Sequence, residues 1–210
     1  MPEISLSRFN ELILLVQQDL ELRSKLVQTG ELFGDYHPLM EALHTSNGTR
    51  LETLIDSFGW PILEIDGPEV LKAAWLIVMH AISLPALQKK ALNLLRASGG
   101  CSPEELAMLE DRILVFSGMK QKFGTQFDWS RDGCLLPYPI ENIEFVDERR
   151  CTIGLPPLSD GIERLRERAR LEGEKPPSDY SAYLSRRESW MLRAGWIYQV
   201  SDIDEAFHQF

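Results

Sequence analysis

Apolar residues recur at helical spacing along most of this chain. In the first predicted helix, over residues 5–28, they are Leu6, Phe9, Leu12, Ile13, Val16, Leu20, Leu22 and Leu26. Intervals of three and four residues place such side chains on one face of an α-helix. The same spacing returns in later segments that glycine and proline separate, so the pattern predicts a mainly α fold.

The most apolar stretch covers residues 70–83 and contains an unbroken apolar run from Ala73 to Met79. A helix that is apolar on every side is a buried helix. The stretch is shorter than the roughly 20 residues that a membrane crossing requires. We therefore predict a helical bundle built around a buried central helix at about residues 70–83, with His80 near its end.

Two glycine-containing dipeptides interrupt the helical pattern. Asp132-Gly133 separates two short runs and is a favoured hairpin turn, which predicts one small β-hairpin at about residues 125–138. Asn47-Gly48 predicts a stop or a kink between helical runs at 36–47 and 49–58.

The pattern also divides the chain near residue 173. Residues 1–172 are expected to form one helical domain, and residues 173–210 a linker followed by an aromatic C-terminal segment. That segment contains Tyr183, Trp190, Trp196 and Tyr198. A solvated tail would expose these large apolar rings to water. We therefore expect the segment to dock on the body or on a second subunit of a homodimer.

Composition narrows the classes of partner and compartment. Thirty-two acidic against 22 basic residues give a net charge of -10, which repels nucleic acid and anionic membranes, so neither partner is expected. The cysteines Cys101, Cys134 and Cys151 are odd in number and lack a C-x-x-C spacing, which favours neither disulfides nor a zinc cluster. No signal peptide is visible at the N-terminus, so the cytoplasm is the expected location.

Several polar residues stand out against the apolar pattern. His80 can titrate near neutral pH and follows the apolar run directly. His37, Glu41 and His44 share one helical face, which fits a metal half-site, an acid/base pair or simply a wet face. Asp19 and Arg23, four residues apart, are expected to form an ordinary solvated pair.

Taken in order, several segments resemble an uncharacterised bacterial family, the domain of unknown function DUF6624. They are Gln18 to Arg23, His37 to Asn47, Gly59 to Pro61, Ala73 to Ala81, Leu109 to Arg112 and Phe123 to Gln126, within about residues 10–160. The resemblance implies that polar family positions are matched by Asp19, Arg23, His44, Asn47, His80, Asp111, Arg112, Thr125 and Gln126. Met79 departs from the family pattern, which often has glutamine there, and the segment after His80 is less acidic than the family's.

The residues favour two classes of function. The first is a non-redox enzyme, such as a hydrolase, cyclase or lyase, acting on a carbonyl or amide of a small molecule or peptide. His80 would be its general acid or base, with His44 beside it and Asp111 orienting it. Its substrate-binding residues would be Gln126, Thr125, Arg112, Asn47, Trp60 and Arg23. We also expect His80 and Gln126 to share one pocket.

The second class is a non-catalytic helical binding or partner-recognition module, in which the same polar residues form a buried structural network. No cofactor is predicted and no residue is assigned to a metal. A metal ion held by His44, His80 and either Glu41 or Asp111 remains a third possibility. Motifs for nucleophilic serine, phosphate or dinucleotide sites do not occur in the sequence.

Overall fold

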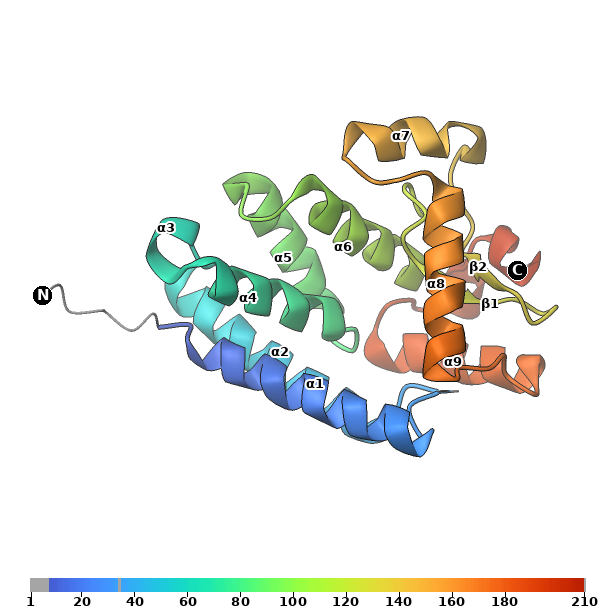
Figure 1. The fold of residues 1–210 in the computed structure, drawn as a ribbon, viewed down its shortest axis with the longest axis horizontal. Helices are drawn as coiled ribbons and strands as arrows, with labels where there is room; N and C mark the ends of the chain where they lie inside the picture. Colours follow the sequence, from blue (N-terminus) through green and yellow to red (C-terminus); the bar gives the residue numbers. More distant parts are fainter. Residues whose placement is uncertain (1–7, 34, 210) are drawn as a thin grey trace, which may run out of the picture. The chain divides into compact units, whose positions relative to one another are not determined.

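The computed structural model describes residues 8–33 and 35–209 and is mainly α-helical with one small antiparallel sheet (Figure 1). This architecture confirms the predicted fold class. The chain divides into two compact units, Met1–Thr29 with His37–Ser102 and Gly30–Tyr36 with Pro103–Phe210. The predicted linker near residue 173 lies inside the second unit. Within the described ranges, every helix is too short or too polar to cross a bilayer.

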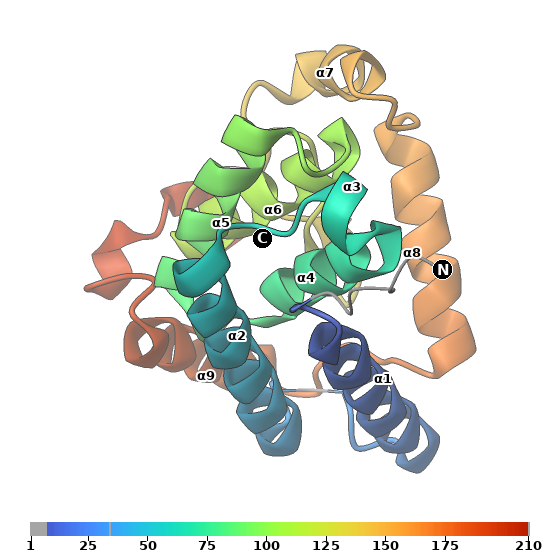
Figure 2. The same ribbon diagram turned by 90° about the vertical axis from the view of Figure 1, so that its left-hand side faces the viewer.

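The first unit consists of helices that lie against one another. They are α1 (Glu11–Thr29), α2 (Pro38–Phe58), α3 (Leu63–Asp66), α4 (Pro68–His80) and α5 (Pro85–Ser98). Helices α1, α2 and α4 pack in pairs, as the two ribbon views show (Figures 1 and 2). The pattern predicted α1 over residues 5–28. Of that range, residues 5–7 lie outside the described residues, and residues 8–10 form a turn before the helix.

Helix α4 is the central helix of this unit, since it contacts α1, α2, α3 and α5. Its buried residues are Val70, Ala73, Ala74, Ile77, Val78 and Met79. The helix ends at His80, three residues before the predicted end. Pro85 begins the next helix and disfavours helical backbone at the residue before it, so the chain turns over residues 81–84. His80 is therefore the last helical residue.

The dipeptide Asn47-Gly48 predicted a stop or a kink, and the stop is wrong, because helix α2 continues to Phe58. Gly48 is buried in its middle. A Cβ atom there would lie 2.7 Å from Leu84 Cδ1 and 2.8 Å from the Cβ of Ala81. The glycine thus serves close packing against the segment that follows α4, and the helical hydrogen bonds continue through it.

The larger segment of the second unit begins with α6 (Pro103–Phe116) and continues into a hairpin of β1 (Phe127–Trp129) and β2 (Leu135–Pro137). The strands pair antiparallel with Asp128 opposite Leu136, which confirms the predicted hairpin. The later helices are α7 (Val146–Thr152), α8 (Leu158–Glu172) and α9 (Tyr180–Ala194). Short 3-10 turns are η1 (Ile143–Phe145), η2 (Val200–Asp202) and η3 (Glu205–Gln209).

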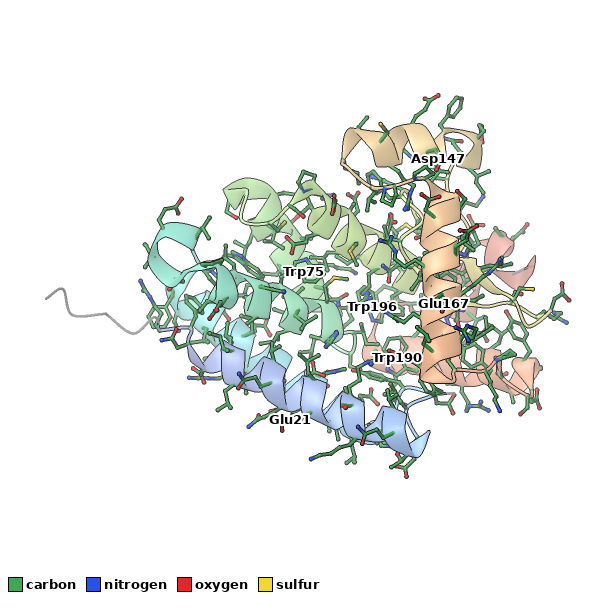
Figure 3. The ribbon with its side chains drawn as sticks, viewed as in Figure 1. Glu21, Trp75, Asp147, Glu167, Trp190 and Trp196 are labelled. Atoms are coloured by element: carbon green, nitrogen blue, oxygen red, sulfur yellow. The ribbon has the colours of Figure 1, made fainter. Side chains whose placement is uncertain are left out.

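The aromatic C-terminal segment is part of the core of this second unit. Trp190 on α9 and Trp196 just beyond it, both labelled in Figure 3, lie with ring centroids 5.2 Å and 5.4 Å from that of Phe116. Phe207 stacks on Tyr138 at 5.6 Å. Burial of these large rings explains why the segment is so aromatic. The homodimer and the cytoplasmic location stay predictions.

Candidate active site

The carboxylate of Asp19 lies at the centre of a buried polar cluster in the first unit. Its Oδ1 accepts a hydrogen bond from Nε2 of His44 at 3.0 Å, and its Oδ2 accepts one from Nδ1 of His80 at 2.5 Å. The two imidazole rings face each other with centroids 4.8 Å apart and planes inclined by 40°. Three helices, α1, α2 and α4, thus each contribute one side chain to the cluster.

Helical periodicity explains why these side chains point inward. On α1 the buried residues are Leu12, Asp19 and Leu26, spaced by seven residues, which places the acid within the apolar stripe of the helix. On α2, His44 lies four residues after buried Met40, on the same face. Because both helices turn these faces toward α4, the polar groups meet inside the unit.

Asp19 is ionised in this environment. The carboxyl group is only 1% exposed, and burial by itself favours its neutral form. The hydrogen bonds from His44 and His80 and their electrostatic attraction to the carboxylate outweigh that effect and hold the pKa of Asp19 well below its usual value. The solvated Asp19–Arg23 pair expected from spacing is therefore wrong in one respect, because Asp19 is not solvated.

An ionised carboxylate only accepts hydrogen bonds, so each ring carries a hydrogen on the nitrogen that faces Asp19. In a neutral His80 ring the proton-accepting nitrogen is then Nε2. The His80 side chain is 26% exposed, against 9% for His44 and 1% for Asp19, so His80 is the member of the cluster that a ligand can reach most directly.

The cluster also has the composition of a small metal site. One ligand atom from each of Asp19, His44 and His80 lies within 4.8 Å of the other two. Imidazole nitrogen and carboxylate oxygen suit zinc, manganese and ferrous iron. These three residues could therefore hold one such ion, with Asp19 in the place that the sequence assigned to Glu41 or Asp111.

Other predicted site residues of the first unit differ in their distance from the cluster. Asn47 is buried and donates from Nδ2 to the carbonyl oxygen of Leu15 at 3.3 Å, which ties α2 to α1. Arg23 is half-buried one turn after Asp19 on α1. Trp60 is buried beyond the C-terminal end of α2, about 20 Å along the helix axis from His44. The structure thus brings His44 and His80 together and leaves Trp60 away from them.

Asp111, Arg112, Thr125 and Gln126 belong to the second unit, where they form a network of their own. Asp111 accepts hydrogen bonds from the backbone N–H groups of Lys122, Phe123 and Thr125 and from the Thr125 hydroxyl, at 2.7–3.1 Å. Burial raises the pKa of Asp111, while these donors lower it in part. In this network Asp111 organises the loop between α6 and β1.

Arg112 and Gln126 complete that network. Nε of Arg112 donates to Oε1 of Gln126 at 3.0 Å, and Nε2 of Gln126 donates to the Met108 carbonyl oxygen at 3.3 Å. Burial lowers the pKa of Arg112 to about 10. The expectation that His80 and Gln126 share one pocket stays a prediction, because the two residues belong to different units.

The sequence assigned no catalytic, binding or metal role to two residues that are central to these networks. Asp19 had a usable signal, since it is an acid at a position where the apolar repeat of α1 requires a buried side chain. Gln121 is fully buried and holds the loop by donating to the carbonyl oxygens of Gln126 and Tyr138, both at 2.9 Å. It lies outside any helix, and no periodicity marks it.

The fold and the cluster together define a mainly helical protein with a buried aspartate shared by two histidines. The chain belongs to DUF6624, a family of unknown function whose sequence profile matches residues 8–172. That match confirms the resemblance seen in the sequence. Neither the curated proteins nor the solved structures include a match to the chain.

Proposed function

We propose that this protein is a non-redox enzyme that transfers a proton at the His80 imidazole, with Asp19 orienting the ring. The observation that carries the proposal is one buried, ionised carboxylate that accepts hydrogen bonds from two histidines. A carboxylate behind an imidazole selects its tautomer and stabilises the imidazolium that forms when the ring takes up a proton. Such pairs perform general acid–base catalysis in many enzymes.

His80 is the proton-transferring residue and His44 supports it. His80 is the more exposed ring, and it stands at the C-terminal end of α4, where the helix dipole favours a positive charge. His44 donates to the second oxygen of Asp19 and so prevents the carboxylate from rotating away from His80. The role of the orienting acid, which the sequence analysis gave to Asp111, passes to Asp19 in this proposal.

The substrate class is a small molecule or peptide with a carbonyl or amide group. A neutral imidazole can take a proton from water or a hydroxyl group as it attacks such a carbon, and can return it to the leaving group. The chemistry is that of a hydrolase, cyclase or lyase and needs no redox cofactor. The competing class is a binding module in which the cluster only stabilises the fold.

A panel of p-nitrophenyl esters and aminoacyl p-nitroanilides at neutral pH tests the proposal. His80→Gln should lower kcat/KM by about 100-fold or more, the usual range for a general base. The matched control is His37→Asn. His37 caps α2 by accepting from the Leu39 backbone N–H at 3.2 Å, and asparagine is also a good cap, so this variant should keep full activity.

Stability measurements on the same variants separate catalysis from structure. If the protein is an enzyme that uses His80, the His80→Gln variant should keep a melting temperature close to that of the wild type. A large fall in melting temperature with unchanged turnover would assign the cluster to the fold alone. A wild-type protein that hydrolyses nothing in the panel contradicts the hydrolase form of the proposal.

The second candidate is a metal centre, which the spacing of ligand atoms in the cluster favours. Elemental analysis of purified protein, with His80→Gln alongside, decides between the two. About one zinc, manganese or iron ion per chain, lost in the variant, would make His80 a ligand and would refute proton transfer by this ring. Full turnover of metal-free protein would refute the metal centre.

A further inference from the structure

Arg187 on α9 holds its guanidinium group among aromatic rings in the second unit. The Cζ atom lies 4.7 Å from the ring centroid of Tyr138 and 5.9 Å from that of Phe207. These two rings also stack on each other. Contact with the aromatic faces fixes the guanidinium plane, because the cation is attracted to the ring and the ring itself is packed.

The hydrogen-bonding edge of this guanidinium is buried and unused. Nε and Nη2 of Arg187 are closed off from solvent, and neither has a hydrogen-bond partner in the part of the chain that the structure describes. Buried charged groups in proteins are nearly always paired, because an unpaired buried donor destabilises the fold. An acceptor that belongs to some other molecule would complete this edge.

Two other arginines of the same chain show what this edge binds. Nε and Nη2 of Arg50 donate to the two carboxylate oxygens of Glu11 at 2.9 Å and 2.6 Å. Arg170 holds Glu167 in the same way, at 2.8 Å and 2.7 Å. A planar pair of donors matches the paired oxygens of a carboxylate or phosphate.

The nearby carboxylate of Asp128 is committed to other donors. Its Oδ2 accepts from the hydroxyls of Tyr138 and Tyr183, and its Oδ1 accepts from the backbone N–H of Trp129 at 2.8 Å. It balances part of the charge of Arg187 and makes no hydrogen bond to it in the described chain. The acceptor for the Nε–Nη2 edge has to come from elsewhere.

We propose that Arg187 anchors a binding site for a ligand that carries an oxyanion, a carboxylate or a phosphate. The ligand's two oxygens accept from Nε and Nη2 once the side chains that cover this edge move aside, while Tyr138 and Phe207 keep the guanidinium in place. This site shares no residue with the Asp19 cluster, so an experiment that refutes one of the two proposals leaves the other unaffected.

Thermal melting of the full chain with inorganic phosphate or with acetate, each matched in ionic strength by sodium chloride, tests the site. At ten times its Kd, the bound anion should raise Tm by about 3–6 °C over the chloride control. Phosphate alone raising Tm would assign a phosphate ligand, and acetate alone a carboxylate ligand. If neither anion raises Tm above the chloride control, the proposal is refuted.

Two variants test whether Arg187 is responsible for the rise in Tm. Arg187→Met should abolish the anion response, because methionine keeps an apolar side chain beside Tyr138 and Phe207 but offers no hydrogen-bond donor. Arg186→Met is the matched control on the same helix, since Arg186 forms an exposed pair with Asp35 at 2.8 Å, and it should keep the response. An anion response that survives in Arg187→Met would refute the site.

Discussion

Replacing Asp19 with asparagine tests the energetic role of the buried cluster most directly. The side chain keeps its shape, but asparagine offers one acceptor oxygen and an NH2 group that donates. Only one of the two histidine donors can keep its acceptor, and the other meets the amide. The bonds at risk are those from His44 at 3.0 Å and His80 at 2.5 Å.

The size of the expected loss in stability follows from the burial of Asp19. A hydrogen bond to a charged group contributes about 1.5–3 kcal/mol, and a donor left unsatisfied in the interior costs a similar amount. Breaking a buried pair by removing one partner destabilises proteins by about 3–5 kcal/mol. We therefore expect Asp19→Asn to lower the free energy of unfolding by about 3 kcal/mol, which in a chain of 210 residues lowers Tm by about 6–12 °C.

The matched control is Glu11→Gln on the same helix. Glu11 also pairs with a residue of α2, Arg50, but both side chains are more than a third exposed. Exposed ion pairs contribute about 1 kcal/mol or less. Urea unfolding and thermal melting at neutral pH should thus show a much larger loss for Asp19→Asn. Equal losses in the two variants would refute the claim that Asp19 is the electrostatic centre of the unit.

Three further outcomes are expected. The pKa of Asp19 in the folded state lies below its usual value of 3.8, so the stability that its ionised form contributes is complete above pH 3.8 and is lost as the pH falls below that value. In an acid titration, the free energy of unfolding of Asp19→Asn should therefore fall less steeply than that of the wild type. Gly48→Ala should lower the free energy of unfolding by about 1–2 kcal/mol, because overpacking against Leu84 and Ala81 exceeds the gain in helix propensity of about 1 kcal/mol. Thermal melting measures this loss, and a rise in Tm would contradict it. Arg150→Lys should lower the free energy of unfolding in urea by about 2–3 kcal/mol. The buried guanidinium of Arg150 donates to the carbonyl oxygens of Pro156 at 2.7 Å and Phe123 at 2.6 Å, and an ammonium group cannot keep both hydrogen bonds. Unchanged stability would show that these hydrogen bonds do not stabilise the fold.

Local physics explains what the sequence could predict. Helical spacing of apolar residues, the apolar run ending at His80 and the Asp132-Gly133 turn all depend on neighbours a few positions apart. These features predicted the mainly α fold, the central helix and the hairpin. The stop predicted at Gly48 failed because a glycine that opens room for a packed neighbour has the same sequence signature as one that ends a helix.

The candidate site depended on contacts between distant residues. The repeat on α1 implies that Asp19 faces the interior, but its partners lie 25 and 61 positions away, on α2 and α4. Which polar groups meet is decided by how three helices pack, and periodicity within one helix carries no information on the register between helices. The same limit applies to Arg187, whose unused edge is visible only once the rings of Tyr138 and Phe207 are in place. The sequence by itself determined the helices and their buried faces, and the tertiary structure decided which side chains those faces bring into contact.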